Sequence, residues 1–321
     1  MKIHLPNSAF LGNVDPFLAS FNPNGKDTLE ISFNKKWIFV HPLALSMVAA
    51  LALTVDSSNI VCEQVEARSG HYLERMGLFD FLKVKSGISI SEHEPAGRFI
   101  PLTQIKNSNK LSDFLKDMIP LLHLEPKHAE SIQYIVSELV RNVLEHSASP
   151  NGAVLAAQYF KKSNTIRIGI ADTGLGIKET INVSYPADNY LEAIRLALMP
   201  GITGTTTRIG GTDDNAGAGL FFIKSIANVN RDFFMIYSGD SMYKLLRKTG
   251  RNKRHVLYAD PNKDQHSKRN DLPFWQGTAV GIDISLDATS EFTALLDYIR
   301  DTYSKAVRER KQAKYKKAKF I

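Results

Sequence analysis

The sequence predicts an α/β protein organised in two domains, and three observations support this fold class. The chain of 321 residues is long enough for two ordinary domains, each with its own hydrophobic core. Its hydrophobic fraction of 43% and its charged fraction of 23% are those of a soluble globular protein. Segments with the alternation of strands exchange along the chain with segments of helical periodicity, which is typical of layered α/β folds.

The first predicted domain covers residues 1–95 and begins with an irregular lead-in over residues 1–28, where prolines and a glycine interrupt the apolar residues. Strands are predicted where apolar residues alternate with polar ones or form a short run, at residues 29–33, 37–40 and 59–65. Helices are predicted at residues 42–53, opened by a proline in the first turn, and at residues 72–82, with a break at Gly77. A polar link over residues 86–95 closes this small α/β unit.

The second predicted domain covers residues 96–288. Its helices are expected at residues 112–124, 127–147, 190–198 and 220–229. Its strands are expected at residues 153–160, 165–171, 233–237, 256–259 and 279–286. A long segment rich in glycine and threonine lies between its two halves, at residues 177–216. The remaining segment, residues 289–321, is predicted to form a helix over residues 291–305 that continues into a basic tail.

Positive charge is concentrated in two segments of a chain whose formal net charge is +7. The first segment runs from Lys244 to Arg269, and the second is the C-terminal tail from Lys305 to Lys319. Such clusters can neutralise the phosphates of nucleic acid. They can equally be a solvated helix end, since cations are favourable near a helix C-terminus. The sequence leaves both interpretations open.

We expect a cytoplasmic protein without a membrane segment. The longest apolar run, residues 43–55, is interrupted by polar residues and is too short to cross a bilayer. The first residues lack an apolar stretch followed by a small-residue cleavage site. The single cysteine, Cys62, excludes an intramolecular disulfide and fits a reducing compartment.

Two polar side chains share one edge of the helix predicted at residues 127–147. At about 100° per residue, the apolar side chains of this helix fall on one face that must be the core, and Glu138 and Asn142 project one turn apart on the adjacent stripe. An amide oxygen suits Mg²⁺, so Asn142 is the candidate metal ligand. A carboxylate one turn away can orient or deprotonate a water near metal-bound phosphates, so Glu138 is the candidate catalytic residue. The alternative is the ordinary polar surface of an amphipathic helix.

Asp172 ends an apolar strand and precedes a glycine turn, Thr173-Gly174-Leu175-Gly176. A carboxylate in this place can accept a hydrogen bond from an exocyclic amine, and Gly174 and Gly176 let the backbone approach a flat ligand. The alternative is a tight turn capped by an aspartate.

A second glycine motif, Asn215-Ala216-Gly217-Ala218-Gly219-Leu220, leads directly into an apolar helix. Its small residues expose the free amides of a helix N-terminus, which suit phosphates, although a flexible loop before a helix would read the same way. The candidate nucleotide-binding residues here are Gly217, Ala218, Gly219 and Leu220. Thr278 opens a late strand, where its hydroxyl can reach the same ligand. Each motif has an ordinary explanation by itself, but an accidental occurrence of all of them in this order is rare.

At these residues the chain resembles the Bergerat, or GHKL, ATP-binding superfamily, which includes gyrase, heat-shock chaperone, sensor histidine kinase and mismatch-repair ATPases. The resemblance covers residues 112–286 and implies an α/β sandwich in which a mixed sheet carries helices on one face and ATP lies between helices and a lid. It implies that Glu138 polarises water, that Asn142 binds Mg²⁺ and that Asp172 binds adenine. The two glycine motifs resemble the glycine boxes of that family, and Gly277-Thr278 resembles its late Gly-Thr element.

Residues 138–148 look most like kinase domains of the soluble type and anti-sigma kinases. Glu145 departs from that pattern, since many histidine kinases carry Lys or Arg there. No helical hairpin with a phosphoacceptor histidine precedes this domain in the sequence, which argues against a self-phosphorylating sensor kinase. The first domain is similar, more loosely, to the STAS-like fold of anti-sigma antagonists, although His41-Pro42-Leu43 stands where phosphorylatable members carry a serine.

Three functions are compatible with these motifs. The preferred one is a Mg²⁺-dependent ATPase whose lid closure and hydrolysis switch a partner protein or a homodimer. The second is a protein kinase that phosphorylates Ser or His of a partner in trans, as in partner-switching circuits. The third is a nucleotide-gated protein that holds nucleic acid through its basic segments. Glu138 favours catalysis over binding alone, and ATP and Mg²⁺ are the expected ligands.

Overall fold

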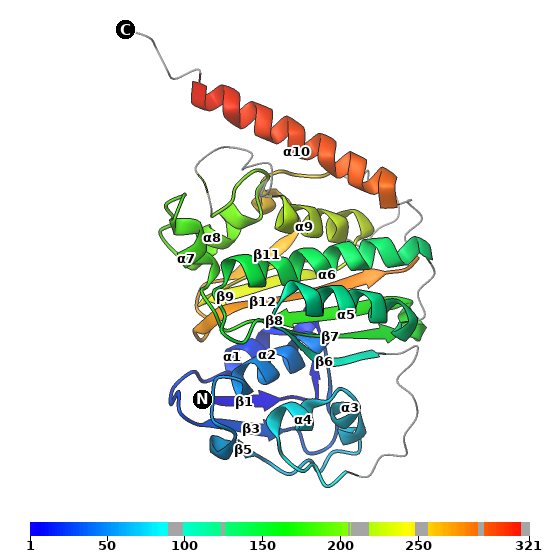
Figure 1. The fold of residues 1–321 in the computed structure, drawn as a ribbon. Helices are drawn as coiled ribbons and strands as arrows, with labels where there is room; N and C mark the ends of the chain where they lie inside the picture. The colour runs from blue at the N-terminus through cyan, green and yellow to red at the C-terminus, as the bar shows by residue number, and fades with distance from the viewer. Residues whose placement is uncertain are drawn as a thin grey trace.

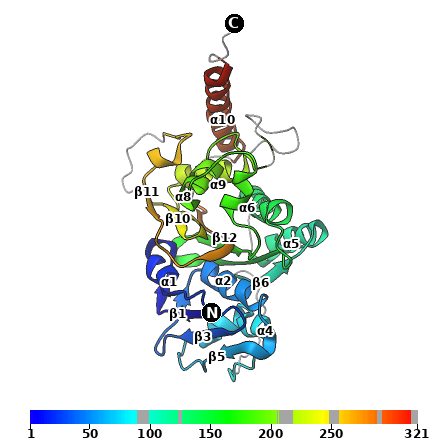
Figure 2. The same ribbon diagram turned by 90° about the vertical axis from the view of Figure 1, so that its left-hand side faces the viewer.

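The computed structural model describes residues 1–88, 99–122, 126–204, 206, 218–247, 256–287 and 292–315. The chain folds into stacked layers: an N-terminal α/β layer, a large central sheet and a layer of helices on the far side of that sheet (Figure 1). Seen from the side, the N-terminal layer and the last helix lie at opposite ends of the stack (Figure 2). Within the described ranges, no helix combines the length and the apolar character needed to cross a bilayer.

The central sheet has seven strands in the order β11-β10-β9-β12-β8-β7-β6. Their bounds are β6 Phe99–Ile105, β7 Ala153–Phe160, β8 Thr165–Ala171, β9 Phe234–Gly239, β10 Ser241–Leu245, β11 His266–Arg269 and β12 Trp275–Ser285. Every neighbouring pair is antiparallel, so the expected mixed sheet is wrong for this layer. Short connections explain the difference, because β7 and β8, and likewise β9 and β10, are joined by turns that only antiparallel strands allow.

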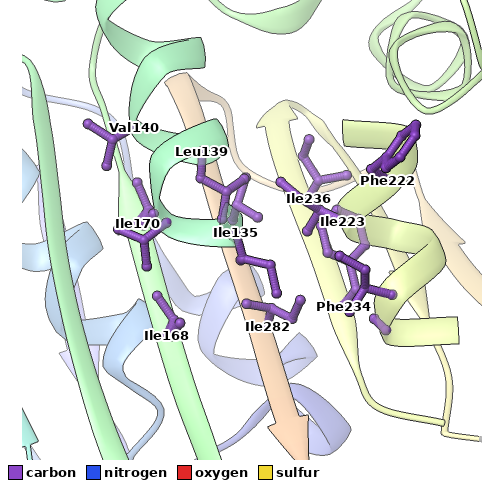
Figure 3. Close-up of a cluster of buried hydrophobic side chains, with 14 of the residues drawn as sticks. Ile135, Leu139, Val140, Ile168, Ile170, Phe222, Ile223, Phe234, Ile236 and Ile282 are labelled. Atoms are coloured by element: carbon purple, nitrogen blue, oxygen red, sulfur yellow. The ribbon is translucent and has the colours of Figure 1, made fainter. Parts of the chain in front are cut away.

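Helices cover one face of this sheet. Their bounds are α5 Ser108–Leu121, α6 Pro126–His146, α7 Ile177–Asn182, α8 Tyr190–Ala197, α9 Gly219–Asn230 and α10 Phe292–Tyr315. Helix α10 lies across α6 and α9 on the side away from the sheet (Figure 1). The core between helices and sheet is a continuous apolar cluster, in which side chains of α6 and α9 meet those of β8, β9 and β12 (Figure 3). Burial of this cluster is the main stabilising contribution to the layer.

The N-terminal layer covers the opposite face, whereas the helices of residues 96–288 cover one face, as expected. Its strands are β1 Lys2–Leu5, β2 Ser8–Ala9, β3 Leu29–Phe33, β4 Phe39–Val40 and β5 Ile60–Cys62, and its helices are α1 Asp15–Ser20, α2 Pro42–Ala52, α3 Gly70–Arg75 and α4 Leu78–Leu82. β1, β3 and β5 form a parallel sheet, and β2 pairs with β4. Helix α2 is buried along its whole length between this layer and the central sheet, as its all-round apolar sequence requires.

The contact between α2 and the central sheet is close enough to require glycine. A Cβ atom at Gly169 of β8 would overlap the backbone of Leu43, and the Ser46 hydroxyl donates a hydrogen bond to the Gly169 carbonyl at 2.9 Å. At the start of α2, the buried His41 accepts a hydrogen bond from Leu43 N and donates from Nε2 to Asp283 Oδ1 at 3.2 Å. Burial lowers the pKa of His41, so the ring is neutral at physiological pH. The N-terminal layer is therefore joined to the sheet by shared packing.

Several predicted elements are confirmed, and others are wrong. The strands at residues 29–33, 153–160 and 165–171 have the predicted bounds, and the predicted break at Gly77 separates α3 from α4. The irregular lead-in is wrong, because residues 1–28 contain β1, β2 and α1. The strand expected at residues 256–259 is absent from the described part of that range, whereas β6, β10 and β11 were not expected. The polar link lies largely outside the described residues.

Candidate functional site

A single cleft brings the predicted motifs together. It has a volume of about 350 Å³ and lies between α6, the ends of β8 and β12, and the start of α9. The predicted site residues that line it are Glu138, Asn142, Asp172, Ala218, Gly219, Leu220 and Thr278. Segments separated by 140 residues of sequence thus converge on one pocket whose size is typical of small-molecule sites. Gly217 and residues 207–216 lie outside the described residues.

Helix α6 presents Asn142 to this cleft with an unsatisfied amide. Its apolar side chains, among them Ile135 and Leu139, pack on the sheet and fix which edge of the helix faces the cleft (Figure 3). The Asn142 Nδ2 atom is buried and has no hydrogen-bond partner among the described residues. A buried polar group left unpaired costs about 1–3 kcal/mol, so such a group calls for an explanation. A ligand in the cleft would supply the partner. A 180° flip of the side-chain amide would instead present its oxygen atom to the cleft.

Glu138 lies one turn earlier on α6 and touches the first turn of α9. A Cβ atom at Gly219 would lie 2.5 Å from Glu138 Oε2, so glycine at this position leaves room for the carboxylate. Partial burial raises the pKa of Glu138 above its ordinary value, and the charge of Arg141 opposes that shift. A carboxylate with a raised pKa is a stronger base, which suits it to accept a proton near neutral pH.

Asp172 forms the floor of the cleft at the end of β8. Its side chain is 1% exposed, and its Oδ1 atom accepts a hydrogen bond from Gly174 N at 2.8 Å. Burial raises the pKa of Asp172 to about 7, against the opposing effect of hydrogen bonds from Gly174, Thr278 and Ser147. The carboxyl group therefore changes charge near neutral pH, and a further donor in the cleft would favour its ionised form.

The first glycine motif lines the cleft through Leu175, whereas its two glycines are not among the lining residues. A Cβ atom at Gly174 would overlap the carbonyl of Ser147, and the next residue, Leu175, donates its amide to that same carbonyl. The turn is thereby clamped to the end of α6. Gly176 precedes α7 and packs against the Ser238 hydroxyl, which accepts a hydrogen bond from Ile177 N at 3.0 Å. Both glycines allow a close approach of backbone and side chains.

The cleft also contains residues that motif reasoning did not select. They include Tyr134, Arg141, Glu145, His146 and Ser147 from α6 and its end, together with Thr180 and Ile202–Gly204. Arg141 is exposed at the cleft and precedes Asn142, so its place on α6 is the signal that could have identified it. Near Ile202, the Arg310 side chain of α10 donates a hydrogen bond to Pro200 O at 2.7 Å. The last helix therefore braces one rim of the cleft, which the sequence did not indicate.

Part of the basic segment between Lys244 and Arg269 has a structural role. Lys244 is buried and forms an ion pair with Asp15 of α1, and Arg269 pairs with Asp271 at 2.7 Å. Lys268 is exposed on β11, at the edge of the sheet, where a charge discourages pairing with another chain. On α10, Lys305, Arg308 and Lys311 are exposed, and the tail beyond residue 315 is outside the described residues.

Comparison of the chain with protein-family models, with curated proteins and with solved structures gives no match. Within the described ranges, no group of three or more His, Cys, Asp or Glu side chains could hold a metal ion. A magnesium ion bound through one amide, phosphate oxygens and waters does not require such a group.

Proposed function

We propose that the cleft binds ATP together with Mg²⁺, in the manner of the Bergerat-type nucleotide sites that its motifs resemble, and that the protein hydrolyses ATP. One observation carries this proposal: the unpaired amide of Asn142, the buried carboxyl group of Asp172 and the N-terminus of α9 line the same cleft of about 350 Å³. These are an amide, a hydrogen-bond acceptor and an anion site, which correspond to the metal, the base and the phosphates of a nucleotide.

Asp172 would recognise the adenine. Its buried carboxylate can accept a hydrogen bond from the exocyclic amine, a group that guanine does not present at the same position. Since burial raises the pKa of Asp172 to about 7, the ionised acceptor is only partly populated in the free protein at neutral pH. Adenine binding would favour the ionised form, so ATP affinity should fall as the pH drops below 7.

Asn142 and the first turn of α9 would hold the phosphates. The unpaired amide of Asn142 fits a metal–phosphate group, because the amide can present its oxygen to the metal or its N–H to a phosphate oxygen. Mg²⁺, when bound there, would neutralise negative charge on the phosphates. Ala218, Gly219 and Leu220 line the cleft at the start of α9, where free amides and the helix dipole favour an anion.

Glu138 would act as the general base. In hydrolysis, a water oxygen forms a bond to the γ-phosphorus, the bond from that phosphorus to the β–γ bridging oxygen breaks, and the water proton passes to Glu138. The partial burial that raises the pKa of Glu138 supports this role. The lid expected within residues 177–216 lies partly outside the described residues. ATP hydrolysis in the cleft would switch a partner protein or a second copy of the chain.

Incubation of the full chain with Mg²⁺ and γ-labelled ATP tests this proposal. Glu138→Gln keeps the shape of the side chain and should abolish phosphate release while leaving ATP bound, since only the base is lost. Glu130→Gln is the matched control, because Glu130 is exposed on the same helix and does not line the cleft. Release of phosphate that is equal in the two variants would contradict the assignment of Glu138.

The same assay separates hydrolysis from phosphotransfer. Glu138 can also accept the proton of a partner's serine hydroxyl, so a cell lysate that becomes labelled on one protein, with little free phosphate, would indicate a kinase acting in trans. The nucleic-acid role is less supported, because Lys244 and Arg269 of the first basic segment are engaged in ion pairs within the chain.

A further inference from the structure

Trp275 supports the Asp172 turn from behind. This residue opens β12, is 1% exposed, and belongs to the apolar cluster that joins the central sheet to the N-terminal layer. Its indole Nε1 donates a hydrogen bond to the backbone carbonyl of Asp172 at 3.2 Å. A buried indole N–H normally has such a partner, and here the partner belongs to the residue whose side chain forms the floor of the cleft.

The residues after Trp275 hold the same turn. The Gln276 side chain donates to Gly174 O at 2.7 Å, and Thr278 O accepts from Asp172 N at 2.9 Å. Between them, Gly277 has a φ of +94°, and a Cβ atom there would overlap the Asp172 carbonyl. The register of β12 against β9 shifts between Trp275 and Thr278, so the strand is irregular where these residues contact the turn.

The Trp275 ring contacts two aromatic side chains. Phe21 follows α1 in the N-terminal layer, and its ring centroid lies 5.7 Å from that of Trp275. The ring centroid of Tyr237 of β9 lies 6.3 Å from that of Trp275, and the Tyr237 hydroxyl donates to the Pro273 carbonyl. The position of the indole, and with it the Asp172 carbonyl, therefore depends on a residue of the N-terminal layer.

We propose that Trp275 is a positioning residue that links the N-terminal layer to the nucleotide site, so that the packing of Phe21 sets the affinity of the cleft for the purine. This inference rests on the proposed function for its ligand, but its structural part is independent of that ligand. Recognition of a base through one carboxylate depends on the direction of the hydrogen bond, which weakens steeply when donor and acceptor are misaligned. A state of the N-terminal layer that moves Phe21 would thereby change ATP affinity without any contact to ATP.

Three variants test the proposal. Trp275→Phe removes the indole N–H but keeps an aromatic ring, and Phe21→Leu loosens the packing against the indole. Phe33→Leu is the matched control, because Phe33 is equally buried in the same N-terminal layer, with a relative exposure of 4% for both residues, and its ring packs on Phe79 at 6.3 Å.

The first measurement needs no ligand. Amide hydrogen exchange of Gly174, whose N–H is bonded to Asp172 Oδ1, should accelerate at least several-fold in Trp275→Phe and Phe21→Leu relative to Phe33→Leu. The second is calorimetric titration with ATP, for which we expect about tenfold weaker affinity in the first two variants and near wild-type affinity in the control. The turnover number at saturating ATP should remain unchanged, because Glu138 is not part of this support.

The outcomes separate the two proposals. Faster exchange at Gly174 together with weaker ATP affinity supports the link. Unchanged exchange in Trp275→Phe, or faster exchange with unaltered ATP affinity, overturns it. If the wild-type chain binds no ATP, the proposed function fails and with it the link to purine affinity, while the exchange data still decide whether Trp275 positions the turn. A loss of affinity equal in Phe33→Leu and Phe21→Leu would also overturn the link, since general loosening of the layer would then be the cause.

Discussion

Replacing Asp172 by asparagine should make the unliganded protein more stable at alkaline pH while it removes nucleotide binding. Asparagine keeps the shape of the side chain and the oxygen that accepts from Gly174 N, but it carries no charge to bury. Its second polar atom is a donor, which would face the donor amine of adenine. Opposite effects on stability and on binding are expected of a residue whose burial serves a ligand.

The size of the stability effect follows from the pKa of Asp172. Burial raises it from 3.8 to about 7, which corresponds to about 4 kcal/mol at most. Below pH 4 both the folded and the unfolded chain hold the proton, and the charge has no effect. Between pH 4 and pH 7 the unfolded chain ionises first, so the free energy of unfolding falls as the pH rises, and above pH 7 the loss is constant. The advantage of Asp172→Asn over the wild type should thus grow by about 3 kcal/mol between pH 5 and pH 8.

Urea unfolding at pH 5 and pH 8 measures this difference. Asp232→Asn is the matched control, because burial also raises the pKa of Asp232 to about 7, and this residue does not line the cleft. The control should show a similar gain at pH 8 and unaltered ATP affinity. If Asp172→Asn is no more stable than the wild type at pH 8, burial of the ionised Asp172 carboxylate does not destabilise the folded chain, and the prediction is refuted.

Three further substitutions test separate parts of the account. Asn142→Ala should leave the fold intact and remove the gain in ATP affinity that Mg²⁺ provides, which calorimetry with and without Mg²⁺ would detect; an unchanged Mg²⁺ effect would argue against Asn142 as the ligand. Gly219→Ala should displace the Glu138 carboxylate, because the added methyl group would lie 2.5 Å from its Oε2 atom. The turnover number should fall about tenfold while the ATP affinity stays nearly unchanged. A normal steady-state rate of phosphate release would contradict this expectation. Gly169→Ala should destabilise the chain by about 2–3 kcal/mol because the added methyl group would overlap the backbone of α2. Gly12→Ala is the control and should be nearly neutral, because its methyl group would meet Phe233 at an ordinary 3.5 Å. Equal melting temperatures of the two variants would contradict the close contact at Gly169.

The elements that carry the cleft could be predicted because their signals are local. The apolar periodicity of α6 placed Glu138 and Asn142 on one edge, and the apolar run of β8 placed Asp172 at a strand end. The elements that were missed depend on distant partners. β1 is a strand because it pairs with β3 through the parallel register that begins at Lys2 and Glu30, and β11 is a polar strand at the sheet edge.

The contacts that support the Asp172 turn could not be predicted, since they are tertiary contacts. The sequence of the turn after Asp172 does not indicate that Trp275 donates a hydrogen bond to it or that Ser147 packs closely against it. The antiparallel sheet and the packing of α2 on its second face are equally properties of the assembled layers. The motifs predicted that Glu138, Asn142 and Asp172 share one cleft, whereas the contacts that support the cleft follow from tertiary packing.

A crystal structure of the full chain with Mg²⁺ and a non-hydrolysable ATP analogue tests the central claim most directly. We expect the exocyclic amine of the base against Asp172, the metal within reach of the Asn142 amide, and the phosphates at the start of α9. Electron density for the nucleotide outside this cleft, or a base in the cleft that makes no hydrogen bond to Asp172, would contradict it.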